Sequence, residues 1–139
     1  MPLTYRILPD LGLVHVRYEG LIDFVETGTV LARYFADPLF RPAQKQLVDV
    51  SRVTGIDNRF AEMLALQART TAAITPRAET LLAFYAPTPA TARFALSGVN
   101  AWSHMPGVVA RLFTDEPGLA AFLGLPEHIL ATLLDPAAP

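Results

Sequence analysis

Asp49 and Asp57 are the two side chains whose type and spacing come nearest to a catalytic pair. Asp49 lies within an apolar run typical of a central strand and Asp57 follows it, and open α/β sheets bind ligands at the carboxyl ends of such strands. Two carboxylates placed there could act as a general acid and a general base. Asp49, however, falls inside the predicted strand, which favours hydrogen bonding to the following loop, and Asp57 is placed to cap the next helix. We expect these structural roles and no catalysis by the pair.

The histidines form no local metal-binding motif. His15, His104 and His128 are far apart in the chain, whereas a helical zinc motif places two histidines four residues apart. The chain has no cysteine, which excludes thiolate metal sites, iron–sulfur clusters and thiol catalysis. We therefore expect no metal, with His15 on the polar face of the second strand and His128 facing solvent.

Motifs for a nucleophile or a phosphate are also missing. Ser51, Ser97 and Ser103 do not occur in a Gly-x-Ser-x-Gly elbow, and Gly55 and Gly107 are isolated, without the glycine spacing of a phosphate-binding loop. The small pair at Ser97 is typical of close helix packing. The sequence therefore predicts a protein that is not an enzyme and that has no cofactor.

Composition excludes several further classes of protein. The chain has 139 residues, of which 52% are hydrophobic and 17% charged, with a formal net charge of −2. This argues against disorder and against sequence-independent binding of nucleic acid, which needs clustered basic residues. Arg77 and Arg93 could meet an anion, although a solvated arginine beside a helix is commoner. The bias toward arginine over lysine is interpreted as a property of a GC-rich genome.

No targeting or membrane signal is predicted. The first residues contain neither the charged nor the apolar region of a secretory signal, so we expect a cytoplasmic protein. The longest uncharged stretch, 94–110, contains glycine, proline and polar residues and cannot form a continuous membrane span.

The first third of the chain predicts a β-hairpin followed by a helix. Residues 4–9 and 13–19 flank a short link that contains Gly12, and Val14, Val16 and Tyr18 alternate with polar residues, which indicates a strand with one buried face. Asp23 with Glu26 has the spacing of a capping box, which predicts a helix over 23–36. Asp37-Pro38 ends this helix, because proline lacks the amide donor.

The remainder predicts alternating helices and strands. Strands are expected at 46–50, 81–86 and 108–113, and helices at 58–74, 89–103, 115–123 and 126–134. Thr88 and Asp115 are expected to cap the helices that follow them. The order ββαβαβαα with long crossovers gives an α/β fold: a mixed five-stranded sheet with right-handed parallel connections, covered by helices on at least one face. We expect one domain over 1–139, with its core at 5–134 and a tail at 135–139.

These segments resemble a known fold family. The run from Leu47 to Asn58 resembles the strand, loop and helix start of STAS domains, the fold of bacterial anti-sigma-factor antagonists. Residues 5–125 as a whole are similar to the SpoIIAA-like family of small bacterial proteins. The supporting segments are Gly20-Leu21-Ile22-Asp23, Asp37-Pro38-Leu39-Phe40, Leu112-Phe113-Thr114-Asp115-Glu116 and Ala120-Ala121-Phe122-Leu123-Gly124.

The resemblance does not extend to the phosphorylation switch. In phosphorylated STAS antagonists the second helix begins with Asp-Ser-Ser-Gly, and the first serine is the phosphorylation site. Here Asp57 matches the aspartate, but Asn58 stands at the acceptor position and is followed by Arg59 and Phe60. An amide is not a kinase acceptor, so the switch is not expected. A helix start presents unpaired amides and partial positive charge, so at this point of the resemblance we expect Asp57, Asn58 and Arg59 to form a polar corner open to a partner. The alternative is that Asp57 and Asn58 only cap the helix.

Apolar residues in the last two helices exceed one narrow stripe. Leu119 to Leu123 and Ile129 to Leu134 are rich in leucine, which indicates either a homodimer interface or a pocket for an apolar ligand. We expect a non-enzymatic binding or regulatory module that acts through protein contacts. A carrier of a small apolar or lipid-like ligand is the alternative, and an enzyme with a pocket joining Asp49, Asp57 and His15 or His104 is the further alternative.

Overall fold

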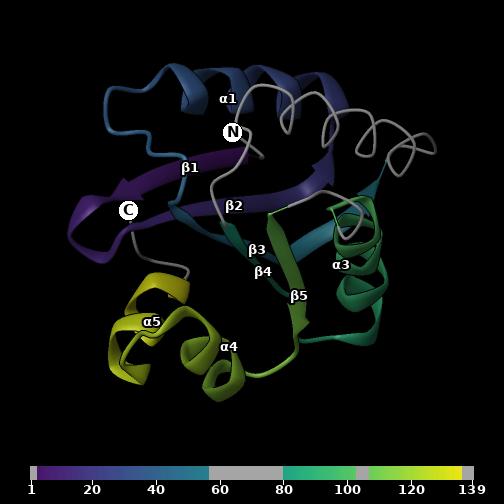
Figure 1. Ribbon diagram of the computed structural model, residues 1–139. Helices are drawn as coiled ribbons and strands as arrows, with labels where there is room; N and C mark the ends of the chain where they lie inside the picture. Colours follow the sequence, from purple (N-terminus) through teal and green to yellow (C-terminus); the bar gives the residue numbers. More distant parts are fainter. Residues whose placement is uncertain (1–2, 57–79, 103–106, 136–139) are drawn as a thin grey trace.

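A five-stranded mixed sheet forms the centre of the molecule (Figure 1). The computed structural model describes residues 3–56, 80–102 and 107–135, without the side chains of Phe24 and Ile56. The strands are β1 (Leu3–Leu8), β2 (Leu13–Ile22), β3 (Lys45–Ile56), β4 (Thr80–Tyr85) and β5 (Val108–Phe113), and they lie in the order β1-β2-β3-β4-β5. β1 and β2 are antiparallel, whereas β2, β3, β4 and β5 are parallel. The mixed sheet with an N-terminal hairpin is confirmed.

The hairpin closes through a short 3-10 turn, η1 (Pro9–Leu11), followed by a glycine. Gly12 has φ +61°, in the left-handed region, and its amide donates a hydrogen bond to the Pro9 carbonyl oxygen. A residue with a Cβ is strained in this conformation, so glycine is needed at this turn.

Helices cover both faces of the sheet. On one face lie α1 (Phe24–Ala36) and α3 (Pro89–Trp102), and on the other lie α4 (Glu116–Leu123) and α5 (Glu127–Leu134), as Figure 1 shows. The described elements follow the expected order, and the predicted helix 58–74 lies outside the described residues. The sequence predicted helices on at least one face of the sheet, and the structure has them on both. Because α4 and α5 cover the second face, the polar residues of β2 on that face lie under helices and not in solvent.

The helix starts agree with the capping residues predicted from the sequence. Asp23 Oδ1 accepts a hydrogen bond from the Val25 amide at 2.8 Å, and Asp115 Oδ1 accepts one from the Gly118 amide at 2.8 Å. Thr88 Oγ1 accepts one from the Thr91 amide at 3.1 Å at the start of α3. These contacts satisfy amides that have no partner within the helix.

The apolar residues of α4 and α5 are used inside the chain. Leu119, Leu123 and Leu130 have no exposed surface and pack against Leu13 and Leu47 of the sheet. The apolar excess that suggested a homodimer is therefore the second core of the domain, and the expected self-association loses this support.

The central strands are longer than predicted. The sequence predicts a third strand over 46–50, but β3 continues to Ile56, because β2 runs on to Ile22 and pairs with it throughout. Two register shifts, at Arg17/Glu19 and Gly20/Leu21, accommodate this pairing. β4 pairs with β3 only as far as Asp49, so the paired ends of β2 and β3 project beyond β4 and β5.

Within the described residues, no helix on its own is long and apolar enough to cross a membrane. Only α4 and α5 taken together meet that length and composition, and they are bent by 112° at their junction.

Candidate functional site

The carboxyl edge of the parallel strands is the candidate site, since crevices at this edge are where open α/β sheets bind their ligands. Here the ends of β2 and β3 project beside the first turns of α3. The predicted partner-binding residues Asp57, Asn58 and Arg59 lie outside the described residues, directly after the last residue of β3. Their role stays a prediction.

Two exposed apolar side chains lie at this edge. Leu21, at the end of β2, is 66% exposed, and Val25, in the first turn of α1, is 74% exposed. They flank Asp23, whose carboxylate caps α1. Leu21 also covers the neighbouring strand, because a Cβ added to Gly55 would lie 3.2 Å from Leu21 Cδ1. The sequence analysis did not single out either residue, since a leucine after a strand and a valine in a helix resemble core positions.

A groove runs beside Leu21, between the projecting end of β3 and α3. It is lined by Val53, Thr54 and Gly55 of β3 and by Ala90, Arg93 and Phe94 of α3, and it encloses about 570 Å³ including the open space at its mouth. Arg93 is exposed and makes no ion pair with any described residue. Among the described residues, the groove therefore combines a mainly apolar lining with the positive charge of Arg93, which has no acidic partner there.

A group of polar residues, Arg17, Asp49 and Arg52, lies under α5, on the other face of the sheet. Arg17 of β2 is paired in register with Asp49 of β3, and both project from the sheet face that α4 and α5 cover. Asp49 is 1% exposed, and its Oδ2 lies 4.0 Å from Arg17 Nε and 3.8 Å from Arg52 Nη1. Its Oδ1 accepts a hydrogen bond from the Ser51 amide at 2.9 Å. The expectation that Asp49 serves local hydrogen bonding is confirmed.

The basic side chains of this group bind the C-terminal end of α5. Arg17 Nη2 donates to the carbonyl oxygens of Leu133 at 2.8 Å and Asp135 at 3.2 Å, and Arg52 Nη2 donates to that of Leu134 at 3.2 Å. Helix C-termini carry unpaired carbonyls and partial negative charge, which cations stabilise. Sequence reasoning missed this role, because it attributed the arginines to genome composition and took their face of β2 as solvated.

His15 is buried, which corrects its predicted place on a polar, solvated face of β2. It is 8% exposed, and burial, followed by the nearby Arg17, lowers its pKa to about 4. Its Nε2 has no hydrogen-bond partner among the described residues. The face is covered because α5 packs over it, and alternation along β2 alone does not reveal that cover. His128 is exposed, as predicted, and His104 lies outside the described residues.

The structure brings together only part of the pocket proposed for an enzyme. Asp49 and His15 share one sheet face, but Asp57 and His104 lie outside the described residues. Within the described parts of the chain, no group of three or more histidine or acidic side chains could hold a metal ion.

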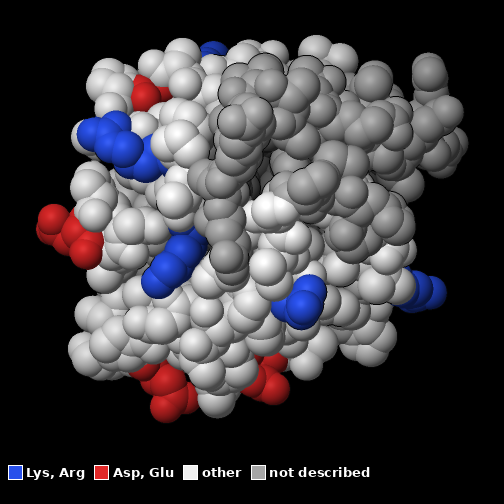
Figure 2. All heavy atoms as spheres, viewed as in Figure 1, with Lys and Arg blue, Asp and Glu red and all other residues white. Residues whose placement is uncertain are grey.

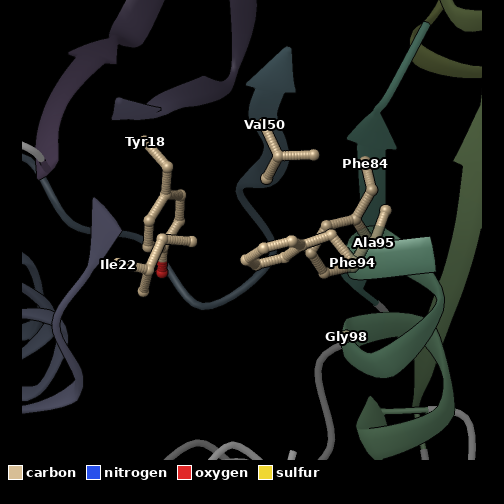
Figure 3. Close-up of a pocket in the computed structure, with 7 residues that line it drawn as sticks. All are labelled: Tyr18, Ile22, Val50, Phe84, Phe94, Ala95 and Gly98. Atoms are coloured by element: carbon tan, nitrogen blue, oxygen red, sulfur yellow. The ribbon is translucent and has the colours of Figure 1, made fainter. Parts of the chain in front are cut away.

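An apolar pocket lies on the opposite face of the sheet, between β2 and α3. Figure 3 shows Tyr18 and Ile22 facing Phe94 and Ala95 across it. Val50, Phe84 and Gly98 also line it, and the space inside it is about 20 Å³. Burial raises the pKa of the Tyr18 hydroxyl to about 12.

Gly98 allows α3 to approach this pocket closely. A Cβ at this position would lie 2.5 Å from Phe84 Cζ, closer than atoms in contact can approach, so only glycine fits over the ring. The prediction that the small pair at Ser97 and Gly98 permits close packing is confirmed. Arg77, the other anion candidate, lies outside the described residues.

On the face that Figure 2 shows, uncharged surface separates the basic side chains from one another. The described residues therefore form no continuous basic patch on this face.

Comparison with known proteins gave no relative: no family model matches the chain, and no curated protein matches it.

Proposed function

We propose that this protein is a non-enzymatic binding module of the SpoIIAA-like type that acts through protein contacts at the carboxyl edge of its parallel strands. The observation that carries the proposal is the exposure of Leu21 and Val25 at that edge. Single exposed apolar residues are common on soluble proteins, but two at one edge of a sheet, with a groove beside Leu21, are typical of an interaction surface.

The arrangement of the polar residues supports a binding role over catalysis. Asp49 and His15, the described candidates for acid–base chemistry, are nearly inaccessible, and the neighbouring Arg17 and Arg52 bind the end of α5. A catalytic base must reach its substrate, and here the helix covers the base. These contacts favour a structural use of the group.

The resemblance to STAS antagonists supports the same edge. There the helix that follows the third strand carries the regulatory serine, and here Asp57, Asn58 and Arg59 follow β3 at the corresponding place. Leu21 and Val25 would extend that corner onto β2 and α1. The partner surface that we propose therefore joins the exposed apolar pair to the polar corner.

A carrier of a small apolar molecule is the second candidate, favoured by the pocket between Tyr18 and Phe94. Among the described residues its lining is apolar except for the Tyr18 hydroxyl, as expected of a ligand pocket. The space inside it, however, is only about 20 Å³, far below the roughly 300–1,000 Å³ of common ligand pockets. The pocket would have to widen before it could take a ligand.

Site-specific photo-crosslinking in the native host tests the proposed edge. A photoreactive phenylalanine derivative replaces Leu21 in one variant and Leu39 in the other. Leu39 is 48% exposed and lies in the loop before β3, at the opposite end of the strands, so it is a matched control. We expect one defined protein adduct at position 21 that is absent at position 39.

The other outcomes discriminate between the alternatives. Equal labelling at both positions would contradict a specific edge, and an adduct with a second copy of the chain would make the partner a homodimer. Native mass spectrometry of protein purified from the host gives the remaining test, since a retained small-molecule mass would favour the carrier.

A further inference from the structure

The groove beside β3 has the features of a site for an added strand. Beyond Asp49, β3 pairs with β2 on one side and with no described strand on the other, and Val53, Thr54 and Gly55 of this segment line the groove. An open strand edge presents unpaired amide and carbonyl groups that can pair with an extended peptide.

The side chains around the groove select the chemistry of such a peptide. Val53 and Phe94 are half-buried and Leu21 is exposed at one end, so apolar side chains of the peptide find contacts there. Arg93 is the charged residue of the lining and has no acidic partner among the described residues. Charge complementarity therefore calls for acidic side chains.

We propose that this groove binds an extended segment of a partner protein in which acidic and apolar residues alternate, as an added strand beside Val53 to Gly55. The inference rests on the proposed function, since it specifies the partner of the same edge. The three groove residues of β3 span about 10 Å at the usual rise of a strand, which matches a peptide of three to five residues.

Titration of the full, ¹⁵N-labelled chain with two synthetic peptides tests this inference by NMR. The probes are the capped pentapeptides Val-Glu-Val-Glu-Val and Val-Lys-Val-Lys-Val. We expect saturable shifts of the Val53, Thr54 and Gly55 amides with the glutamate peptide, about tenfold tighter binding than with the lysine peptide, and weaker binding as salt is added.

Charge reversal at Arg93 tests whether the peptide binds in this groove. Arg93→Glu is expected to weaken binding of the glutamate peptide about tenfold. The matched control Arg33→Glu, at an exposed arginine on α1, should leave the binding unchanged. The amide spectrum reports whether each variant is folded, and Arg93→Gln replaces Arg93→Glu if the latter is not.

Three results would overturn the inference: no shift at Val53 to Gly55, equal binding of both peptides, or binding that does not respond to Arg93. If the peptides fail while Leu21 still forms its specific adduct with a protein, the binding module stands and the added strand is wrong. If both fail, the proposed function fails with it.

Discussion

Arg17 of β2 donates a 2.8 Å hydrogen bond from Nη2 to the carbonyl oxygen of Leu133, in the last turn of α5. The same guanidinium lies with its Nε 4.0 Å from the buried Asp49 Oδ2, so one side chain joins a central strand, its neighbour and the C-terminal helix. This contact explains why a charged residue occupies the covered face of the sheet. What Arg17 contributes to the free energy of unfolding therefore depends on both Asp49 and α5.

Arg17→Met is expected to lower the free energy of unfolding by about 3–5 kcal/mol, because it leaves the Asp49 carboxylate buried with less compensation. Urea denaturation followed by circular dichroism measures the change. Arg6→Met, an exposed position on β1, is the control and should change stability by no more than about 0.5 kcal/mol. In the Arg17→Met background, Asp49→Asn should cost less than in the wild type, and full additivity of the two changes would contradict the coupling.

Stability should fall as the pH drops from 6.5 to 4. The folded pKa of His15 is about 4 and the ordinary value is 6.5, so in this window the unfolded chain binds a proton that the folded chain does not. The contribution is complete above pH 6.5 and its loss by pH 4 is on the order of 3 kcal/mol. Urea denaturation between pH 4 and 8 measures the slope.

Comparison of two histidine variants tests whether His15 causes this dependence of stability on pH. His15→Gln removes the titrating group and should flatten the profile, whereas His128→Gln, at an exposed position of α5, should keep it. An unchanged slope in His15→Gln would show that other groups cause the acid sensitivity.

Gly98→Ala is expected to destabilise the domain by about 1–3 kcal/mol, although alanine favours a helix over glycine by up to about 1 kcal/mol. The added methyl would lie 2.5 Å from Phe84 Cζ, so the ring or α3 must move. Thermal unfolding measures the effect, and Ser97→Ala is the control on the same helix. Shortening the ring with Phe84→Leu should reduce the penalty of Gly98→Ala, and an equal penalty in both backgrounds would contradict the proposed clash.

Asn58→Arg tests the corner predicted from the sequence. Loss of a helix cap costs about 0.5–2 kcal/mol and should leave the domain folded, whereas a bulky cation should prevent a partner from docking. Circular dichroism checks the fold, and the yield of the Leu21 photo-adduct checks the partner. A folded variant with an undiminished adduct would make this corner purely structural.

Local signals predicted much of the fold. The alternation of Val14, Val16 and Tyr18 identified one buried face of β2, and Asp23 and Asp115 identified helix starts, because each signal depends on neighbouring residues. The length of β3 was underestimated because Ser51 to Ile56 form a strand only through their pairing with β2. Intrinsic preference carries little of that information.

The errors in the candidate site have the same origin. His15 and Arg17 looked solvated because nothing near them in sequence shows that α5, more than one hundred residues later, covers them. Leu21 and Val25 carried no sequence signal of their own, because their exposure depends on where the covering helices end. A long-range contact can be identified only once both partners are placed.

The cover formed by α4 and α5 also affects biosynthesis. Leu13, Leu47 and Ala83 emerge from the ribosome well before Leu119 and Leu130, which bury them. Until then the nascent sheet presents an apolar face to the cell, and such transient surfaces are recognised by chaperones and prone to aggregate. A premature stop codon before α4 would therefore yield an insoluble fragment and not a smaller working domain, so α4 and α5 protect a sheet that is synthesised before them.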